Sequence, residues 1–435
     1  MKINFKFMLV SLILLAAPSA FSQDYAQKEY NYLTQLRQSA GDKLTDFLIA
    51  EYEHYLIAYP FSEKTPEVLL QMCERWQQQG KEFKALSSYL KLFYIFPDFA
   101  ASNNIRAKIE AMVSTERSLR NRKEKILSLL VKPRLATESA QRYFNFLESL
   151  SVLAGSDMEQ LVDQLITESY FFHDRYPDDV RRDSLSIWVA DIYRRYGEYR
   201  EASSEYLKFD YLYTSSTFLP YARYQRGILA FEKLKEPQEA IDILQSVVKQ
   251  HKTSEYARKS HFAIGQVYEE KLKNYQQAIG AYRLVVTDFN DGKDAVSALE
   301  RIAIIQHKRL RTTAEAVKTY REILEKFTEQ VKSPRLYVEC AELYLKDLKD
   351  YNQAATFYAL AAEKNPKHED ASSLWIDAGE VCDRQLHDYK RAIQYYQKVI
   401  ELYPSHKNAR KAQDKINDAE KKITPVQEQT TEKEN

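Results

Sequence analysis

The sequence predicts an all-α fold, a solenoid of antiparallel helix pairs, from three regularities within residues 178–410. An alanine recurs every 38 residues, at Ala202, Ala240, Ala278, Ala316, Ala354 and Ala392. A large side chain follows each alanine by four residues: Tyr206, Leu244, Tyr282, Tyr320, Tyr358 and Tyr396. A small residue precedes each by twelve or thirteen: Ala190, Gly227, Gly265, Ala303, Ala341 and Gly379. Small and large residues at a fixed step are typical of helix pairs that stack on their neighbours.

The overall composition agrees with a helical protein and excludes some functions. The 435 residues include only nine glycines and twelve prolines, which is typical of helices joined by short turns. Basic residues number 63 and acidic residues 62, so the formal net charge is +1. Such a balance gives no field that would attract nucleic acid or a strongly acidic substrate.

The N-terminus has the pattern of a secretory signal peptide over residues 1–22. Lys2 and Lys6 precede an apolar run over residues 7–17, and Ala20 and Ser22 form a small-x-small site before Gln23. A buried N-terminal helix is the alternative interpretation. No cysteine follows the site, so we expect no lipid anchor of the bacterial lipoprotein kind. No later apolar run approaches about 18 residues, so we expect no membrane segment in the mature chain.

The cysteine pattern and glycosylation motifs bear on the compartment. Cys73, Cys340 and Cys382 are too few for a disulfide framework, and each falls on the packed face of an expected first helix. We expect buried small hydrophobic residues, with a Cys340–Cys382 bridge as the alternative. The sequence contains no Asn-x-Ser/Thr acceptor, which together with the few cysteines favours a bacterial periplasm.

The sequence predicts five segments along the chain, of which the signal peptide is the first. After residues 1–22 come helix pairs over 23–100, an irregular helical insert over 101–157, a regular array over 158–412 and a disordered tail over 413–435. In the insert, one continuous helix is expected from Asn103 to Val131, where Pro133 stops it. The tail lacks aromatic residues and periodicity, which predicts disorder.

Two further features of these segments need an interpretation. The insert carries a basic run, Arg117, Arg120, Arg122, Lys123 and Lys125, in which Glu116 and Glu124 are interspersed. A solvated helix face is the simpler explanation of this run, and an anionic docking patch is the alternative. In the regular array a leucine recurs at one turn of each repeat, and we expect it to be buried under the neighbouring repeat: Leu234, Leu272, Leu310, Leu348 and Leu386.

The last repeat resembles the tetratricopeptide repeat (TPR). The family's pattern of Trp, Gly, Tyr, Tyr, Ala, aromatic and Pro corresponds here to Trp375, Gly379, Cys382, Tyr389, Ala392, Tyr396 and Pro404. The period of 37–38 residues is longer than the family's value of about 34. The resemblance covers roughly residues 24–100 and 158–410 and implies a right-handed superhelix of antiparallel helix pairs. It also implies a concave groove lined by the first helices, where members of the family bind protein ligands.

The family's contact positions, counted from the small residue of each first helix, give the candidate partner-binding residues. They carry charged, amide and aromatic side chains, and the groove is mixed in charge: Asp191, Arg194, Arg195, Tyr224, Phe231, Phe262, Gln266, Glu269, His307, Lys308, Glu342, Lys346, Glu380 and Arg384. We expect the aromatic members to anchor apolar side chains of a peptide, although packing between repeats is the alternative. Acidic and basic members could also pair with each other across repeats.

No motif of an enzyme, a metal site or a cofactor site stands out. The sequence has no P-loop, no dinucleotide fingerprint and no His-Glu-x-x-His. Ser88 and Lys91 match Ser-x-x-Lys, but they fall mid-helix and no Lys-Thr-Gly accompanies them. We therefore expect no enzyme, no catalytic residue, no metal and no cofactor.

The sequence thus predicts a non-enzymatic periplasmic scaffold that binds a protein or peptide in its groove, in envelope assembly, division or export. A different class of function is a superhelix that binds peptidoglycan or exported polysaccharide, because the 32 tyrosines could stack on sugars. An enzyme with an unrecognised pair of carboxylates is a third hypothesis. Partner identity and oligomeric state do not follow from the sequence.

Overall fold

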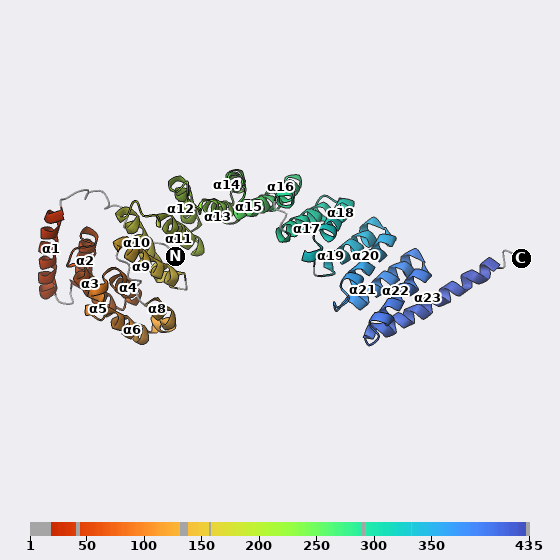
Figure 1. The fold of residues 1–435 in the computed structure, drawn as a ribbon, viewed down its shortest axis with the longest axis horizontal. Coiled ribbons are helices and arrows are strands. Elements are labelled where there is room, and N and C mark those ends of the chain that lie inside the picture. The colour runs from red at the N-terminus through yellow and green to blue at the C-terminus, as the bar shows by residue number, and fades with distance from the viewer. Residues whose placement is uncertain are drawn as a thin grey trace. The chain divides into compact units, whose positions relative to one another are not determined.

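A computed structural model describes residues 19–40, 44–130, 138–155, 158–288, 292–331 and 333–431. Within these ranges every regular element is a helix, which confirms the predicted all-α fold (Figure 1). The chain divides into two compact units, Met1–Ala222 and Arg223–Asn435, and the division falls inside helix α13, Leu219–Leu229. The two units are described separately below.

The first unit contains four helix pairs. Each pair is two antiparallel helices joined by a short connection, and the bounds are α1 Ser19–Ala40 with α2 Thr45–Ala58, α3 Thr65–Gln78 with α4 Glu82–Ile95, α9 Ser139–Ala154 with α10 Val162–Arg175, and α11 Arg182–Arg195 with α12 Tyr199–Leu212. A 3₁₀ turn, Glu159–Leu161, precedes α10. Helix α9 packs against α4 as well as against α10, so the third pair follows directly on the second.

Four short helices interrupt the pairs between α4 and α9: α5 Pro97–Ser102, α6 Ile105–Thr115, α7 Arg117–Arg120 and α8 Lys123–Leu129. The prediction of one helix from Asn103 to Val131 is therefore wrong. Asn104 has a left-handed backbone and Glu116 an extended one, so the chain turns at both. These turns let α7 and α8 pack on α6, where Leu119 and Ile126 are fully buried. Pro133 lies outside the described residues.

The predicted insert, residues 101–157, also wrongly includes helix α9. Because α9 belongs to the row of helix pairs, only α5–α8 stand apart from it. A one-dimensional pattern missed this because the apolar residues of α9 have the same helical spacing as those of the short helices before it.

The second unit holds the regular repeats. The first helices are α13, α15 Glu255–Gln266, α17 Lys293–Lys308, α19 Arg335–Leu343 and α21 Ala371–Val381. The second helices are α14 Pro237–Gln250, α16 Tyr275–Asp288, α18 Thr313–Lys326, α20 Tyr351–Lys364 and α22 Tyr389–Leu402. A 3₁₀ turn, Thr328–Gln330, follows α18. From α14 onward, each helix packs against the next along the chain, and α23, Lys407–Thr431, closes the unit against α22 (Figure 1).

The repeated small residues close each pair of helices, as the sequence predicted. The six alanines of the repeat are fully buried. A Cβ atom on Gly265 would lie 2.6 Å from Cε1 of Tyr282, and one on Gly227 would lie 2.7 Å from Cγ of Leu244. Gly379 faces Tyr396 in the same way. The large residue of the second helix therefore lies directly against the backbone of the first helix, which no larger residue would allow.

The turn leucines are less buried than predicted. Leu272 is 40% exposed and Leu348 is 36% exposed, while the other three are half-buried. Four of the five first helices end in a π-helical turn: Ala230–Leu234, Val267–Lys271, Tyr344–Leu348 and Cys382–Leu386. The residue after each turn leucine has a positive φ: Lys235, Lys273, Arg311, Lys349 and His387. The extra residue of the 38-residue period therefore widens the last helical turn, and the leucine stays near the surface.

The same turn starts the next helix. The amide of Asp350 donates to the Tyr344 carbonyl at 3.0 Å, which closes the end of the first helix around the left-handed Lys349. The Asp350 carboxylate then accepts from the Gln353 amide at 3.1 Å and caps the second helix. Asp388 repeats both bonds in the last repeat.

The predicted disordered tail is wrong for most of its length. Helix α23 continues to Thr431, and Ala412, Ile416 and Ala419 are buried at helical spacing on one face. The apolar stripe is narrow and built mostly from alanine, so it does not stand out in a charged sequence. Residues 432–435 lie outside the described residues.

The three cysteines are free thiols and fully buried, as expected for small hydrophobic residues. Burial raises the pKa of Cys340 to about 12 and that of Cys382 to about 11. In the part of the chain that the structure describes, no helix has the length and apolar character needed to cross a membrane.

The glycine contacts lead to a stability prediction. Gly379→Ala should lower the free energy of unfolding by about 1–3 kcal/mol, because its Cβ would displace the Tyr396 ring. Gly280 is the matched control, since a Cβ there meets nothing within 4 Å on helix α16. Gly280→Ala should be neutral or stabilise by up to about 1 kcal/mol. Thermal unfolding followed by circular dichroism compares the two; equal melting temperatures would show that the close contact is not required.

Candidate functional site

The first helices of the second unit lie beside one another and are joined by ion pairs. Arg258 on α15 contacts Asp294 on α17 at 3.0 Å, and Arg335 on α19 contacts Glu300 on α17 at 2.5 Å. We call the side chains at the predicted contact positions of these helices, within residues 223–402, the first-helix face. Its composition decides what the unit could bind.

Glu269, a predicted contact residue, is part of a buried network and not of an open surface. Its side chain is only 8% exposed, and it accepts hydrogen bonds from the Tyr282 hydroxyl at 2.9 Å and from Arg301 Nε at 3.1 Å. Burial, and then the Glu269 charge, raise the pKa of the Tyr282 hydroxyl. Because Arg301 belongs to the next first helix, Glu269 links two repeats.

Two further acidic members of the first-helix face, Glu342 and Glu380, are also partnered within the chain. Glu342 pairs with Lys346 at 2.7 Å. Glu380 pairs with Arg384 at 3.3 Å and with Lys415 of α23 at 3.1 Å. Glu342 and Glu380 therefore pair with basic residues four positions along the same repeat, and not with the basic contact positions of a neighbouring repeat. In the last repeat, α23 also supplies Lys422, which contacts the buried Asp383 at 2.6 Å, so α23 covers these positions.

The aromatic candidates divide into accessible and buried ones. Tyr224 and Phe262 are half-buried; the Tyr224 ring lies 5.6 Å from that of Tyr256, and the Phe262 ring 5.2 Å from that of Tyr282. Phe231 is only 5% exposed, with the Lys271 ammonium 5.4 Å from its ring centre. The alternative that these rings pack between repeats therefore holds for Phe231.

Three polar candidates complete the predicted set in this unit. Gln266 is half-buried on α15. His307 is half-buried and lies 3.3 Å from the Thr313 hydroxyl, while its neighbour Lys308 is exposed. These residues surround the apolar positions without forming a charged clamp.

The candidates of the first unit form a polar cluster of their own. Asp191 accepts hydrogen bonds from the hydroxyls of Tyr206 and Tyr221, the latter at 2.7 Å, and lies 3.5 Å from Arg194. Burial, and then Asp191, raise the pKa of both tyrosine hydroxyls. Arg195 donates to the Gly155 carbonyl. These three candidates therefore hold helices together within the first unit.

Sequence reasoning missed the apolar members of the first-helix face. They occupy the same positions as the predicted residues and are half-buried: Ile228, Ile304, Val338 and Leu345. The prediction took only polar and aromatic side chains from these positions, although the same spacing identifies the aliphatic ones. With Tyr224 and Phe262, they form a half-buried apolar set on this face, beside exposed charged members such as Lys308 and Lys346.

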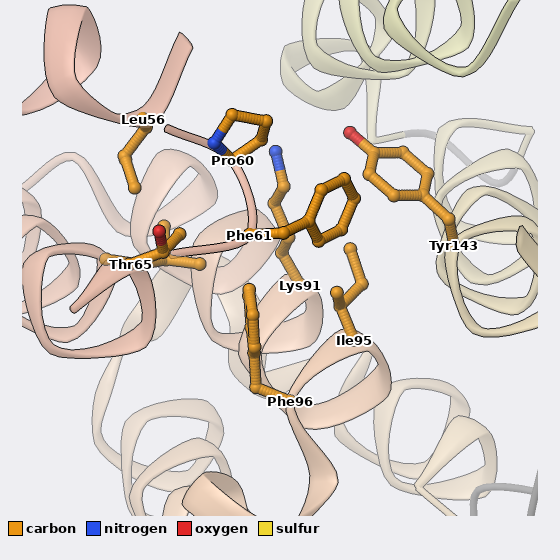
Figure 2. Close-up of a pocket in the computed structure, with 9 residues that line it drawn as sticks. Leu56, Pro60, Phe61, Thr65, Lys91, Ile95, Phe96 and Tyr143 are labelled. Atoms are coloured by element: carbon orange, nitrogen blue, oxygen red, sulfur yellow. The ribbon is translucent and has the colours of Figure 1, made fainter. Parts of the chain in front are cut away.

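A small pocket in the first unit holds Lys91 of the Ser-x-x-Lys match (Figure 2). Its volume is about 10 Å³, which is room for about one water molecule. Lys91 pairs with Glu168 at 2.7 Å, and the Tyr143 hydroxyl donates to the same carboxylate. Phe61 and Phe96 line the rest of the pocket in Figure 2. The lysine therefore has a structural partner, and the space admits no substrate.

Within the described residues, no group of three or more His, Cys, Asp or Glu side chains could hold a metal ion.

Sequence models of the tetratricopeptide repeat match residues 221–254 and 372–406. The two matches coincide with the helix pairs α13–α14 and α21–α22 of the regular array. The chain contains tetratricopeptide repeats. Repeats of this family support a protein-binding scaffold, which agrees with the first-helix face of this TPR protein. No curated protein matches the chain over its sequence.

Solved structures of similar fold include three helical repeat proteins. A TPR protein from Parabacteroides merdae is 16% identical, covers 64% of this chain and 99% of its own, and has a TM-score of 0.35. The C-terminal part of a TPR protein from Cytophaga hutchinsonii is 15% identical, covers 63% and 99%, and has a TM-score of 0.40. Yeast Tom70 is 14% identical, covers 93% and 90%, and has a TM-score of 0.32.

The buried and surface carboxylates of the TPR array should differ in their effect on stability. Glu269→Ala should cost about 2–4 kcal/mol, because it leaves Arg301 and the buried Tyr282 hydroxyl without their acceptor. Glu300→Ala removes a more exposed pair with Arg335 and should cost less than about 1 kcal/mol. Urea unfolding measures both; a larger loss for Glu300→Ala would contradict the assignment.

Proposed function

We propose that this TPR protein is a non-enzymatic scaffold that binds a protein or peptide segment on the first-helix face of its second unit. The observation that carries the proposal is the difference between the charged and the apolar side chains of this face. Charged side chains such as Glu269, Glu342 and Glu380 pair within the chain, whereas half-buried apolar side chains occupy the same positions on neighbouring first helices.

The half-buried apolar residues specify the kind of ligand. Tyr224 and Ile228 on α13, Phe262 on α15 and Ile304 on α17 occupy neighbouring first helices. A segment lying across these helices would cover them with its own apolar side chains and gain about 25 cal/mol for each Å² of apolar surface removed from water. The helices are already formed, so the partner orders on them with little rearrangement.

A clamp for a charged terminus has less support on this face. A carboxylate ligand needs cations whose charge is not already neutralised, but Arg301 is held by Glu269 and Lys346 by Glu342. Among the described residues at the predicted positions of this unit, the exposed Lys308 is the cation that forms no ion pair. We therefore infer that apolar side chains of the partner supply the affinity and that polar contacts at Gln266 and His307 position it.

The observation that suggested the polysaccharide alternative, the number of tyrosines, gives it less support in the folded chain. Many of the tyrosines that could have stacked on sugars are packing residues, and Tyr52, Tyr89, Tyr206, Tyr282 and Tyr396 have almost no exposed surface. A protein partner therefore remains the function that the site supports best.

We further propose that the chain is exported to the periplasm and acts in envelope assembly, division or export. The support is the signal-peptide pattern over residues 1–22, of which residues 1–18 lie outside the described part. Cleavage before Gln23 is compatible with the fold, because Ala26 is the first described buried side chain of α1. Removal of the preceding residues would leave the packing of α1 on α2 in place.

Site-specific photo-crosslinking tests the binding face. Crosslinkers at Tyr224 and Gln266 should capture one discrete protein in native cells, and Phe262→Ala should reduce that product at least about fivefold by removing an anchor. A crosslinker at Gln245, exposed on the second helix α14, is the matched control and should capture little. Equal products from Gln245, or no protein product from either face position, would contradict the proposal.

Cell fractionation and N-terminal sequencing test the location. The mature chain should appear in the periplasmic fraction and begin at Gln23. Replacing the apolar Leu14 and Leu15 by arginine should leave the chain uncleaved in the cytoplasm, because a charged core does not function as a signal peptide. An uncleaved cytoplasmic wild-type chain would show that residues 1–22 are not a signal.

A further inference from the structure

A cluster of exposed cations surrounds one contact in the first unit, away from the first-helix face. The Ser118 hydroxyl donates to the Glu82 carboxylate at 2.8 Å and fastens α7 to the first turn of α4. Exposed Lys81 and Lys84 stand within two residues of Glu82, and exposed Arg117 and Arg120 stand within two residues of Ser118. With exposed Lys123 at the start of α8, these residues are called the α4–α7 cation cluster: Lys81, Lys84, Arg117, Arg120 and Lys123.

Two of these cations share one aromatic ring. The Lys81 ammonium lies 4.7 Å from the centre of the Trp76 ring, and the Lys84 ammonium lies 4.4 Å from it. The ring attracts each ammonium, but the two like charges repel each other. An anion bound beside the two ammonium groups would reduce this repulsion. The two lysines are therefore well placed to bind an anion.

Within the described residues, none of the five cations forms an ion pair with a carboxylate. Arg120 instead donates to the Thr115 carbonyl at 3.1 Å. Acidic neighbours are present, because Glu116 and Glu124 lie in the same segment and Glu82 accepts from Ser118. Glu53 is close enough that Lys84 and Lys81 lower its pKa, although burial raises it overall. This state contrasts with the second unit, where cations such as Arg301 and Lys415 are paired.

The cations stand on a fixed frame. Leu119 on α7 and Ile126 on α8 are fully buried, and the buried Met112 and Val113 belong to α6, on which both short helices pack. The four helices α5–α8 are not needed to continue the row of pairs, because α9 packs directly on α4. An insertion with its own small core and unpaired outward cations is consistent with a docking element.

We propose that the α4–α7 cation cluster docks an acidic segment of a partner protein, one rich in Asp and Glu. Carboxylates of such a segment can form charge-assisted hydrogen bonds with the lysine ammonium groups and two-pronged contacts with Arg117 and Arg120. A membrane surface is disfavoured, because no large apolar side chain is exposed in the described residues between Ile57 and Val152. Helices that bind membrane surfaces normally combine cations with exposed apolar anchors.

Fluorescence anisotropy of a labelled peptide of Glu and Gly residues, titrated with the full chain, tests the proposal. The wild-type chain should bind saturably, and added salt should weaken binding because the contacts are exposed charges. R117E/R120E should weaken binding at least about tenfold by placing like charges opposite the peptide. K364E/K367E makes the same charge change at exposed positions of the second unit and should change affinity less than about twofold.

Further arms make the outcome decisive. R120Q/K123Q removes two positive charges without adding negative ones and should weaken peptide binding by an intermediate amount. It replaces R117E/R120E as the test if that variant shows an altered circular dichroism spectrum. Failure of the wild-type chain to bind the peptide, or equal weakening by K364E/K367E, would overturn the proposal. Sedimentation with phosphatidylglycerol vesicles is run in parallel. Tighter binding to vesicles than to the peptide, lost in R117E/R120E, would assign the cluster to lipid and also overturn it.

Discussion

The contact between a small residue of each first helix and a large side chain of its partner helix underlies the rest of the structure. In one repeat the Tyr282 ring lies against Gly265, and its hydroxyl then donates to Glu269, which pairs with Arg301 of the next first helix. One close approach thus closes a helix pair and places the polar group that joins it to its neighbour. In the first unit, Tyr206 makes the corresponding hydroxyl contact to Asp191.

This arrangement explains why the two candidate binding surfaces differ. On the first-helix face, Glu269 pairs with the next first helix and Glu342 pairs with Lys346 of its own repeat, while apolar side chains such as Ile228 are half-buried at the same positions. In the insertion α5–α8, Lys108 pairs with Glu74 of α3, but the exposed Arg117 and Arg120 form no ion pair within the described residues. A scaffold built this way would recognise one segment by shape and apolar contact and another by charge.

The sequence was sufficient for the helix pairs and insufficient where conformation depends on distant packing. Fully buried Ala278 and Ala354 followed from their spacing alone. The left-handed backbone of Lys349 could not be predicted from the sequence, because glycine is the residue that normally indicates that conformation. The break at Glu116 was hidden in a continuous helical pattern. Of the candidate site, the positions were predicted, but the burial of Glu269 depends on which residue of the next repeat it meets.

The central claim is that a protein partner lies on the first helices of the second unit. Hydrogen–deuterium exchange tests it most directly, comparing the free chain with the chain bound to the protein captured through Tyr224. The account predicts slower exchange in α13, α15 and α17, which carry the apolar positions, and unchanged exchange in the second helices α14, α16 and α18. Protection confined to the second helices would place the partner on the opposite surface and contradict the account.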